Sequence, residues 1–342
     1  MSDEYQQRLQ AQKNQYQTGA EIHELPQIFH YWSHKFLRPR MEAVFNVTSV
    51  RDFYAKPFAS RLEAALGQIK FVSIGSGDCN SEVEITEYLL SLGHRNFSFI
   101  CLEVSDTLIR EAKSKVRAKG LDSHVHVINF DVNRETLDFP VHGFMAHHSL
   151  HHIMELERLF SMIDACLDPS GCFLTMDMIG RNGHMRWPET LGFIDALWNV
   201  IDDSKKFSHQ FREYHPKFVN HDCSNEGFEG IRAQDIMPLL VSRFSFTHFC
   251  AVGGLIDIFI DRSYGPNFNV TNPIDICFID FVEELNSNLI KLGFVKPTML
   301  YAAMTKKDPA VKPRIIGSLT PEFCVRVAFG ISGDGMIPVK RL

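Results

Sequence analysis

The chain contains no closely spaced pair of cysteines. Its eight cysteines stand singly at positions 79, 101, 166, 172, 223, 250, 277 and 324, so the CxxC and zinc-finger spacings are absent. Lysine and arginine form no basic tail, and the formal net charge is -6, which argues against a nucleic acid partner. The most apolar window, residues 249–260, is too short to span a membrane, and the polar start MSDEYQQRLQAQ has no signal core. These absences predict a cytoplasmic protein that binds neither nucleic acid nor a membrane.

The stretch KFVSIGSGDC, residues 70–79, reads as a strand, a glycine turn and the start of a helix. The apolar strand ends at Gly75-Ser76-Gly77, where the next helical pattern begins. In an α/β sheet this order presents the carboxyl edge of the strand to a nucleotide-like ligand, and the glycines let the backbone approach it closely. Asn80 stands where the dinucleotide fingerprint needs its third glycine. A ligand without a pyrophosphate, such as S-adenosylmethionine, therefore fits this turn better than NAD does.

An acidic residue ends each of the next two predicted strands. Residues 97–102 run into Glu103, and residues 124–130 run into Asp131. A carboxylate at the tip of the second strand can accept hydrogen bonds from the ribose hydroxyls of a nucleotide. A carboxylate at the tip of the third strand can accept one from an adenine amino group. For Glu103 the alternative is an exposed acid at the end of the strand.

Strand and helix patterns alternate from residue 70 to residue 178. The predicted strands are 71–74, 97–102, 124–130, 141–146 and 172–178, and the predicted helices are 80–92, 107–119 and 155–167. Two further strands, 244–252 and 298–304, flank a helix at 274–291. This alternation predicts an α/β fold with a Rossmann-like, doubly wound, seven-stranded sheet.

The alternation also predicts a division of the chain. Residues 1–66, in which prolines 26, 39 and 57 break the helical patterns, form a helical N-terminal cap, and residues 67–305 form the sheet domain. Residues 179–240 interrupt the alternation between strands five and six, as an insertion that shapes a substrate pocket. Residues 306–342 form a C-terminal extension, and within it FCVRVAF (323–329) is either an extra strand or a homodimer contact.

Four histidines follow the fourth predicted strand in the block HHSLHHI, residues 147–153. His147 and His148 lie at the strand edge, where we expect His147 to contact the cofactor and His148 to act in catalysis. His151 and His152 are expected to line the cofactor site or to support the turn. A pair such as His147 and His151 could instead hold a metal ion. No third ligand stands nearby in the sequence, so no metal is expected.

Substrate-side candidates lie in the insertion and in the cap. In RNGHMRWPE, residues 181–189, His184 is a candidate base, Arg186 a candidate clamp for a carboxylate or phosphate, and Trp187 a candidate wall for a sulfonium methyl group. The alternative is a structural loop in which Trp187-Pro188 starts the next helix. The other candidate substrate-binding residues are Tyr31, Trp32, Tyr214 and Asp177, and Asp177 either holds a substrate amine or orders the loop.

Taken as a set, these segments resemble the class I S-adenosylmethionine-dependent methyltransferases. The resemblance rests on VSIGSGD (72–78), SLHHI (149–153), LDPSGCFLTMDM (167–178) and the two strand-tip acids, and it covers residues 70–305. It departs from the usual GxGxG turn at Cys79, which stands in place of the third glycine. The chain also resembles a bacterial group of methyltransferases of unassigned substrate that shares its HYWS, SLHH and RNGHMRWPE segments.

The resemblance implies a seven-stranded sheet with one antiparallel strand. It also implies that Gly75 and Gly77 line the methionine end of the cofactor, that Glu103 holds the ribose, and that Asp131 with Val132 borders the adenine. The full set of predicted cofactor-binding residues is Gly75, Ser76, Gly77, Glu103, Val104, Asp131, Val132 and His147.

The sequence therefore predicts an enzyme that transfers a methyl group from S-adenosylmethionine to O, N or C of a small molecule, in bacterial secondary or specialised metabolism. One alternative is an enzyme that cleaves or cyclises S-adenosylmethionine without methyl transfer. Another is a nonenzymatic scaffold that keeps the fold. Product analysis separates the first two functions, because S-adenosylhomocysteine marks methyl transfer and methylthioadenosine marks attack on the aminobutyrate chain.

Overall fold

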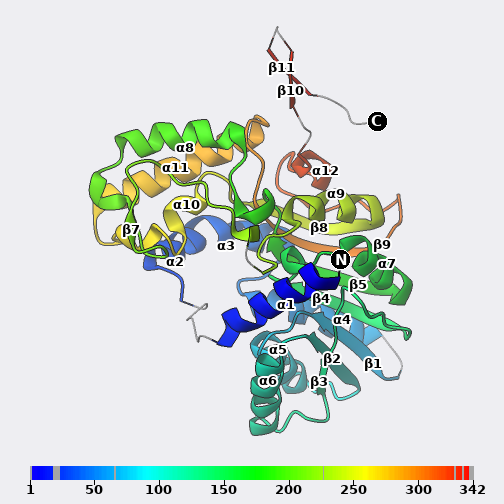
Figure 1. Ribbon diagram of the computed structural model, residues 1–342. Helices are drawn as coiled ribbons and strands as arrows, with labels where there is room; N and C mark the ends of the chain where they lie inside the picture. The colour runs from blue at the N-terminus through cyan, green and yellow to red at the C-terminus, as the bar shows by residue number, and fades with distance from the viewer. Residues whose placement is uncertain are drawn as a thin grey trace.

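The computed structural model describes residues 2–17, 24–64, 67–225, 227–326, 329–332 and 335–338. A seven-stranded sheet lies at the centre of this part of the chain (Figure 1). Its strands are β1 (Ile69–Ile74), β2 (Phe97–Glu103), β3 (Val125–Asn129), β4 (Val141–His147), β5 (Leu167–Met178), β8 (Phe244–Val252) and β9 (Met299–Lys306). Their order is β3-β2-β1-β4-β5-β9-β8, and only β9 runs antiparallel to its neighbours within this sheet. This arrangement confirms the predicted Rossmann-like sheet with one antiparallel strand.

Helices cover both faces of the sheet, which is why its strands are nearly continuous apolar runs. One face packs against α4 (Val50–Ala64), α5 (Asn80–Ser91) and α6 (Asp106–Ala118), and the other against α7 (Leu156–Cys166) and α9 (Ala233–Arg243). Successive residues of β1 point to opposite faces. Phe71 stacks on Phe58 of α4 with ring centroids 4.2 Å apart, whereas Val72 packs in the core that contains α7.

A helical lobe lies beside the sheet, at the upper left of Figure 1. It contains α2 (Gln27–Trp32), α3 (Arg38–Phe45), α8 (Pro188–Val200), α10 (Asp257–Ile260) and α11 (Pro273–Lys291), with the short strands β6 (Phe207–Ser208) and β7 (Glu213–Tyr214). A π-helical turn, Ser33–Leu37, joins α2 to α3. Trp32 is 2% exposed, and its Nε1 donates a hydrogen bond to Glu283 of α11 at 2.9 Å. The N-terminal helices α2 and α3 are therefore part of the same lobe as α11.

The described parts of segment 1–66 lie in three places. α1 (Ser2–Gln17) crosses the carboxyl ends of the strands, α2 and α3 lie in the helical lobe, and α4 packs on the sheet. Pro26 precedes α2. Helical backbone runs from α2 through the π-helical turn into α3 and past Pro39, so the break predicted there does not occur, and α4 likewise continues through Pro57, where a break was predicted. Burial of Phe53, Tyr54 and Phe58 on either side of this proline holds the helix together. The boundaries of a separate cap stay a prediction.

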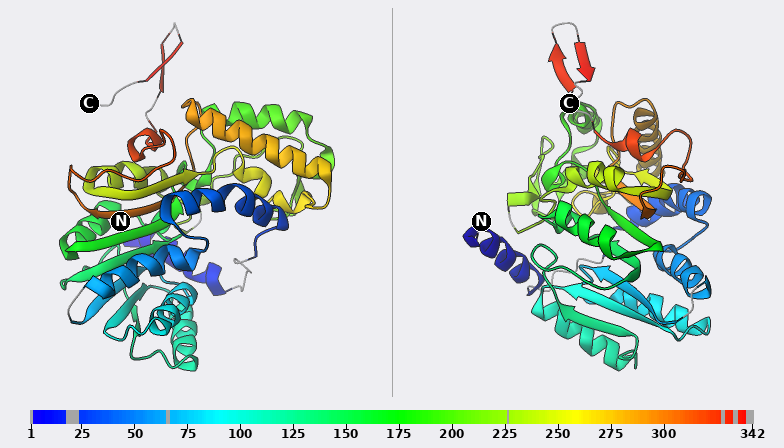
Figure 2. Two further views of the ribbon diagram at one scale, coloured as in Figure 1. Left: turned by 180° about the vertical axis from the view of Figure 1, so that it is seen from behind. Right: turned by 90° about the vertical axis from the view of Figure 1, so that its right-hand side faces the viewer.

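Two further expectations differ from the structure. β5 begins at Leu167 instead of residue 172, because Leu167 already pairs with Val141 before a shift in register. The predicted strand 323–329 begins inside a helix, α12 (Pro321–Cys324), whose first turn is capped by Thr320; residues 327 and 328 lie outside the described residues. β10 (Phe329–Ser332) pairs with β11 (Gly335–Pro338) as a separate hairpin (Figure 2). Within the described ranges, no helix has the length and apolar composition needed to cross a membrane.

Candidate active site at the carboxyl edge of the sheet

The turn after β1 contains two glycines, Gly75 and Gly77, with different surroundings. Gly75 has a φ of +63°, and a Cβ added there would lie 2.8 Å from the Cβ of Ser149. Gly77 has a φ of +57°, and a Cβ added there would meet nothing within 4 Å. Ser149 also donates a hydrogen bond from its Oγ to the carbonyl of Ile74 at 2.6 Å. Gly75 therefore fits the β1 turn against the turn after β4, whereas Gly77 faces space that a ligand can fill.

The carboxylate of Glu103 is fixed by three backbone N–H groups. Its Oε2 accepts from Gly77 at 2.9 Å, and its Oε1 accepts from Val104 at 2.9 Å and from Ser105 at 2.8 Å. Glu103 is 9% exposed, and burial raises its pKa although these hydrogen bonds oppose the shift. The residue predicted to hold a ribose thus also ties the tip of β2 to the glycine turn.

A cavity of about 130 Å³ opens at this edge. Its lining residues are Tyr5, Leu9, Gln12, Gly75, Gly77, Leu102, Glu103, Val104, Leu108, Phe130, Val132, Asn133, His148, Ser149, His152, Ile153 and Phe228. The lining includes five of the predicted cofactor-binding residues, and no lysine or arginine is among the residues that line it. The other three, Ser76, Asp131 and His147, lie close by without forming part of the lining. Sites for small ligands are commonly larger, at about 300–1,000 Å³.

Helix α1 covers the cavity, and its Tyr5 binds Asp131, the residue predicted to accept a hydrogen bond from adenine. The Tyr5 hydroxyl lies 2.8 and 2.7 Å from the two carboxylate oxygens of Asp131, to which it donates, and it accepts from Asn133 at 3.2 Å. The Arg134 guanidinium lies 4.2 Å from the centre of the Tyr5 ring, and burial raises the pKa of the Tyr5 hydroxyl. Arg8 donates to the carbonyl of Gly227 at 3.0 Å and so anchors the helix on the opposite side.

Asp177 shapes the turn that carries the histidines. This side chain is fully buried in β5 and accepts hydrogen bonds from the backbone N–H groups of Ser149 at 2.9 Å and Leu150 at 2.7 Å. It also contacts Nδ1 of His151 at 2.6 Å. Through these hydrogen bonds Asp177 positions the turn. Because the side chain has no exposed surface, it does not make the predicted contact with a substrate.

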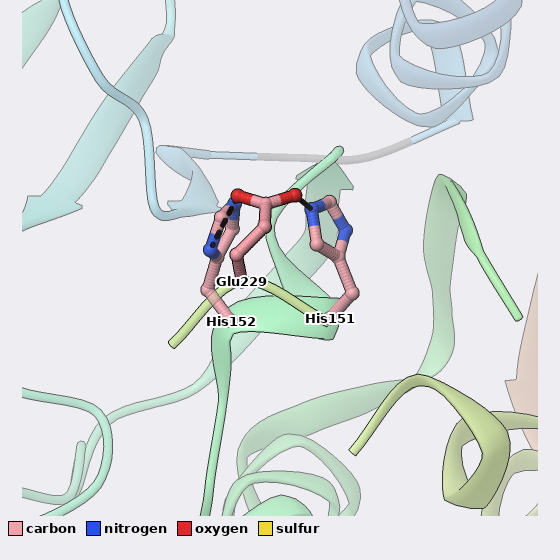
Figure 3. Close-up of side chains that lie close together, drawn as sticks. All are labelled: His151, His152 and Glu229. Atoms are coloured by element: carbon pink, nitrogen blue, oxygen red, sulfur yellow. Dashed lines mark ion pairs between the residues drawn. The ribbon is translucent and has the colours of Figure 1, made fainter. Parts of the chain in front are cut away.

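Glu229 lies at the centre of a group of histidines (Figure 3). Its carboxylate oxygens lie 3.5 Å from Nε2 of His151 and 3.7 Å from Nδ1 of His152. Nε2 of His184 lies 2.7 Å from Oε1 of Glu229, and burial lowers the pKa of His184. His147 turns away from this group, because its Nδ1 bonds the Ser81 hydroxyl at 3.1 Å. The suggested pairing of His147 with His151 at a metal ion therefore does not occur.

Burial and charge set the protonation of these side chains. Burial lowers the pKa of His148 and of His152 to about 3, which leaves both rings neutral at pH 7. Burial acts in the same direction on His151, but the carboxylates of Asp177 and Glu229 outweigh it and raise the pKa of His151 to about 10. The neighbouring histidines hold the pKa of Glu229 well below its usual range, although burial opposes them.

None of the candidate side chains of RNGHMRWPE is among the residues that line the cavity, and His184 lies beside Glu229. Arg186 contacts Asp257 through its guanidinium at 3.3 Å, so its charge is already paired. The ring of Trp187 lies under the guanidinium of Arg326, 4.2 Å from its centre. Trp187 is also the residue before Pro188 at the start of α8, which agrees with the alternative of a structural loop.

The remaining aromatic candidates lie in the helical lobe and not in the cavity. Tyr31 donates to Asp280 at 2.8 Å and accepts from Lys35 at 2.9 Å, on the side of the lobe formed by α2 and α11. Trp32 is buried against α11, and Tyr214 is 47% exposed on β7. Tertiary contacts that the sequence did not show therefore account for Tyr31 and Trp32 without a substrate.

Two residues of the site had no signal in the sequence. Tyr5 lies in a polar, glutamine-rich segment, and Glu229 lies in an irregular stretch of the insertion far from the histidine block. Their positions depend on how α1 and the insertion fold back onto the sheet, and no local spacing reports such long-range contacts.

Comparisons with known proteins place the chain near methyltransferases at low similarity. No protein-family model matches it, and no curated protein matches it. An O-methyltransferase from a trans-AT PKS multienzyme of Brevibacillus brevis, in complex with S-adenosyl-L-homocysteine, is 13% identical over 75% of this chain and 70% of that chain, with a TM-score of 0.45. Geranyl diphosphate C-methyltransferase from Streptomyces coelicolor A3(2), with Mg²⁺, geranyl diphosphate and S-adenosyl-L-homocysteine, is 14% identical over 74% of this chain and 80% of that chain, with a TM-score of 0.39. Similarities this low transfer neither residue roles nor a substrate to this chain.

Proposed function

We propose that the protein transfers a methyl group from S-adenosylmethionine to a small molecule. The observation that carries the proposal is the cavity at the carboxyl edge of β1 and β2, which joins a two-glycine turn and a buried carboxylate to a group of histidines. Carboxyl edges of parallel strands are where α/β folds bind nucleotide-like ligands. The absence of lysine and arginine from the lining supports an adenosyl ligand without phosphates.

The residues at this edge fit an adenosyl sulfonium in four respects. Gly77 faces open space, and Ser76 has a buried Oγ that finds no hydrogen-bond partner in the described part of the chain, so it is available to a polar group of the cofactor. Glu103 presents the carboxylate for the ribose, and Val132 lies on the apolar side of the cavity, where an adenine ring would pack. When bound, the cofactor supplies an electrophilic methyl group on sulfur.

Cofactor binding requires α1 to move. The cavity volume of about 130 Å³ is smaller than the roughly 300–1,000 Å³ typical of ligand sites. Tyr5 also donates a hydrogen bond to the Asp131 carboxylate, which an adenine amino group would use. We therefore propose that the structure shows a closed form, in which α1 stands over the place of the adenosine.

Among the three catalytic candidates we prefer His148, because it lines the cavity whereas His184 and Arg186 do not. Its ring is neutral at pH 7, so it adds no positive charge beside a sulfonium. Methyl transfer is an in-line displacement, and holding the acceptor atom close to the methyl carbon supplies much of the rate. A base is needed only where the acceptor atom still carries a proton. His184, paired with Glu229 at 2.7 Å, is our candidate for that role.

The finer parts of the proposal concern the acceptor and the setting. We propose an acceptor that reacts at O, N or C, from bacterial secondary or specialised metabolism, and a cytoplasmic protein that belongs with the bacterial group sharing its HYWS, SLHH and RNGHMRWPE segments. We propose no nucleic acid or membrane partner, and gel filtration tests whether the protein forms a homodimer.

Binding and product analysis test the function. Calorimetry with S-adenosylhomocysteine is expected to show one site per chain, and the Gly77→Val variant, whose side chain enters the open space beside the turn, is expected to abolish it. Incubation with deuteromethyl S-adenosylmethionine and a panel of hydroxy, amino and enolic compounds is expected to yield labelled product and S-adenosylhomocysteine. Methylthioadenosine without labelled product would instead indicate cleavage of the cofactor, and no binding at all would indicate a scaffold.

A further inference from the structure

We propose that His151, His152 and Glu229 bind a divalent transition-metal ion at the edge of the cavity. One ligand atom from each residue lies within 4.8 Å of the other two. Figure 3 shows the two imidazole rings on either side of the carboxylate, with a ring nitrogen of each directed at a carboxylate oxygen. The three side chains come from the turn after β4 and from the insertion, so only the folded chain assembles them.

The spacing of these atoms is that of ligands around an ion. Bonds of about 2.0–2.2 Å from zinc to nitrogen and oxygen put neighbouring ligand atoms about 3–4 Å apart. Nε2 of His151 lies 3.5 Å from one oxygen of Glu229, and Nδ1 of His152 lies 3.7 Å from the other. Both separations exceed the 2.7–3.2 Å of a good hydrogen bond between nitrogen and oxygen. The arrangement thus leaves room for an ion among the three groups.

An unpaired nitrogen points into the same space. Nδ1 of His152 is buried and has no hydrogen-bond partner among the described residues, and an oxygen of Glu229 lies 3.7 Å from it. Buried polar atoms in native proteins nearly always have a partner, so one without any calls for a ligand or an ion.

The surrounding contacts resemble those that support bound metal ions. Nδ1 of His151 contacts the buried carboxylate of Asp177 at 2.6 Å, which turns Nε2 of the ring toward Glu229. A carboxylate that holds the far nitrogen of a metal-binding histidine is a usual feature of metal sites. His184 contacts Oε1 of Glu229 at 2.7 Å and so orients the third ligand. Two imidazoles and one carboxylate favour Zn²⁺, Fe²⁺ or Mn²⁺ over Mg²⁺, which prefers oxygen ligands alone.

The position of the ion gives it a role that rests on the proposed function. His152 lines the cavity, so an ion with three protein ligands would present an open position to a molecule bound there. Such an ion would hold an acceptor through a deprotonated oxygen and place it beside the methyl group. Metal binding requires His151 to release the proton that its raised pKa keeps on the ring at pH 7. It requires neither the cofactor nor an acceptor, so it can be measured separately.

The test is metal binding by the full chain, purified without a histidine tag and stripped with EDTA. Equilibrium dialysis against Zn²⁺ and Mn²⁺, followed by metal analysis, is expected to show one equivalent of bound ion and no retention of Mg²⁺. His152→Ala and Glu229→Gln are expected to weaken Zn²⁺ binding about 100-fold or more. His126→Ala, an exposed histidine on β3, serves as the control and is expected to bind as the unchanged protein does.

Two results would overturn the proposal. If the unchanged protein retains less than about a tenth of an equivalent of Zn²⁺ and Mn²⁺, the group is an ion-paired cluster of histidines around Glu229. If both variants bind as tightly as the control, the ion lies elsewhere. Circular dichroism of each variant shows whether it is folded. Because S-adenosylhomocysteine is absent from these measurements, a failure here leaves the cofactor-binding result intact, and the reverse also holds.

Discussion

Replacement of Glu103 by glutamine tests whether its carboxylate holds a ribose or only the glycine turn. In the structure its two oxygens accept three backbone hydrogen bonds, from Gly77, Val104 and Ser105. If the free lone pairs also accept from ribose hydroxyls, Glu103→Gln loses a hydrogen bond to a charged group, which is worth about 1.5–3 kcal/mol. S-adenosylhomocysteine should then bind about 10- to 150-fold more weakly by calorimetry.

The same variant with a second ligand separates the two roles. The 2′-deoxyribose analogue of S-adenosylhomocysteine already lacks the 2′-hydroxyl. If Glu103 binds that hydroxyl, Glu103→Gln should weaken binding of this analogue much less than binding of S-adenosylhomocysteine. This double-change cycle isolates the contact between carboxylate and hydroxyl from any effect on the turn. Equal losses for both ligands would refute the ribose role and leave Glu103 as a support of Gly77. Glu84→Gln, at an exposed position of α5, is the matched control and should change neither affinity.

Three further predictions follow from the geometry of the same region. Tyr5→Phe removes the hydrogen bond to Asp131, worth about 1.5–3 kcal/mol for a charged acceptor, so association of S-adenosylhomocysteine in stopped-flow should become faster; an unchanged rate would show that α1 does not limit entry. Gly75→Ala should lower the urea midpoint more than Gly77→Ala does, because only the first added Cβ meets Ser149, at 2.8 Å, while both have a positive φ; equal midpoints would contradict the tight contact. Burial raises the pKa of Glu82 to about 7 from 4.5, so the folded protein holds the proton on this carboxyl more tightly than the unfolded chain does. The free energy of unfolding should therefore fall by about 2–3 kcal/mol as the pH rises from 5 to 8. Glu82→Gln should lack that fall in urea unfolding at the two pH values, and a parallel pH dependence in both proteins would exclude Glu82 as its source.

The sheet could be predicted because its signals are local. β1, β2 and β8 are apolar runs bounded by turn residues, and the observed β8, Phe244–Val252, has the predicted bounds. The two acids at the strand tips follow from the same reasoning, since the carboxyl ends of parallel strands share one edge. Glu103 accordingly lines the cavity. Asp131 lies beside it, with its carboxylate bound to Tyr5.

The substrate side could not be predicted because its contacts are tertiary. The indole groups of Trp32 and Trp187 could contact a ligand, but in the structure Trp32 donates a hydrogen bond to Glu283 and the ring of Trp187 packs against Arg326. Glu229 shows the converse: nothing in its neighbourhood in the sequence indicates a site, and the fold of the insertion brings it to the histidine block. Residue type alone does not distinguish these cases, because both kinds of partner lie far away along the chain.

The cofactor cavity and the histidine group are parts of one connected turn. Asp177 holds the backbone of Ser149, whose hydroxyl bonds the carbonyl of Ile74 immediately before the glycine turn. The same carboxylate holds the ring of His151, which faces Glu229. A change at Asp177 should therefore disturb cofactor binding and metal binding together, whereas a change at Glu229 acts on the metal side alone. Because β5 supplies this shared support from its buried interior, the proposed function would have the sheet itself set the position of an acceptor relative to the methyl group.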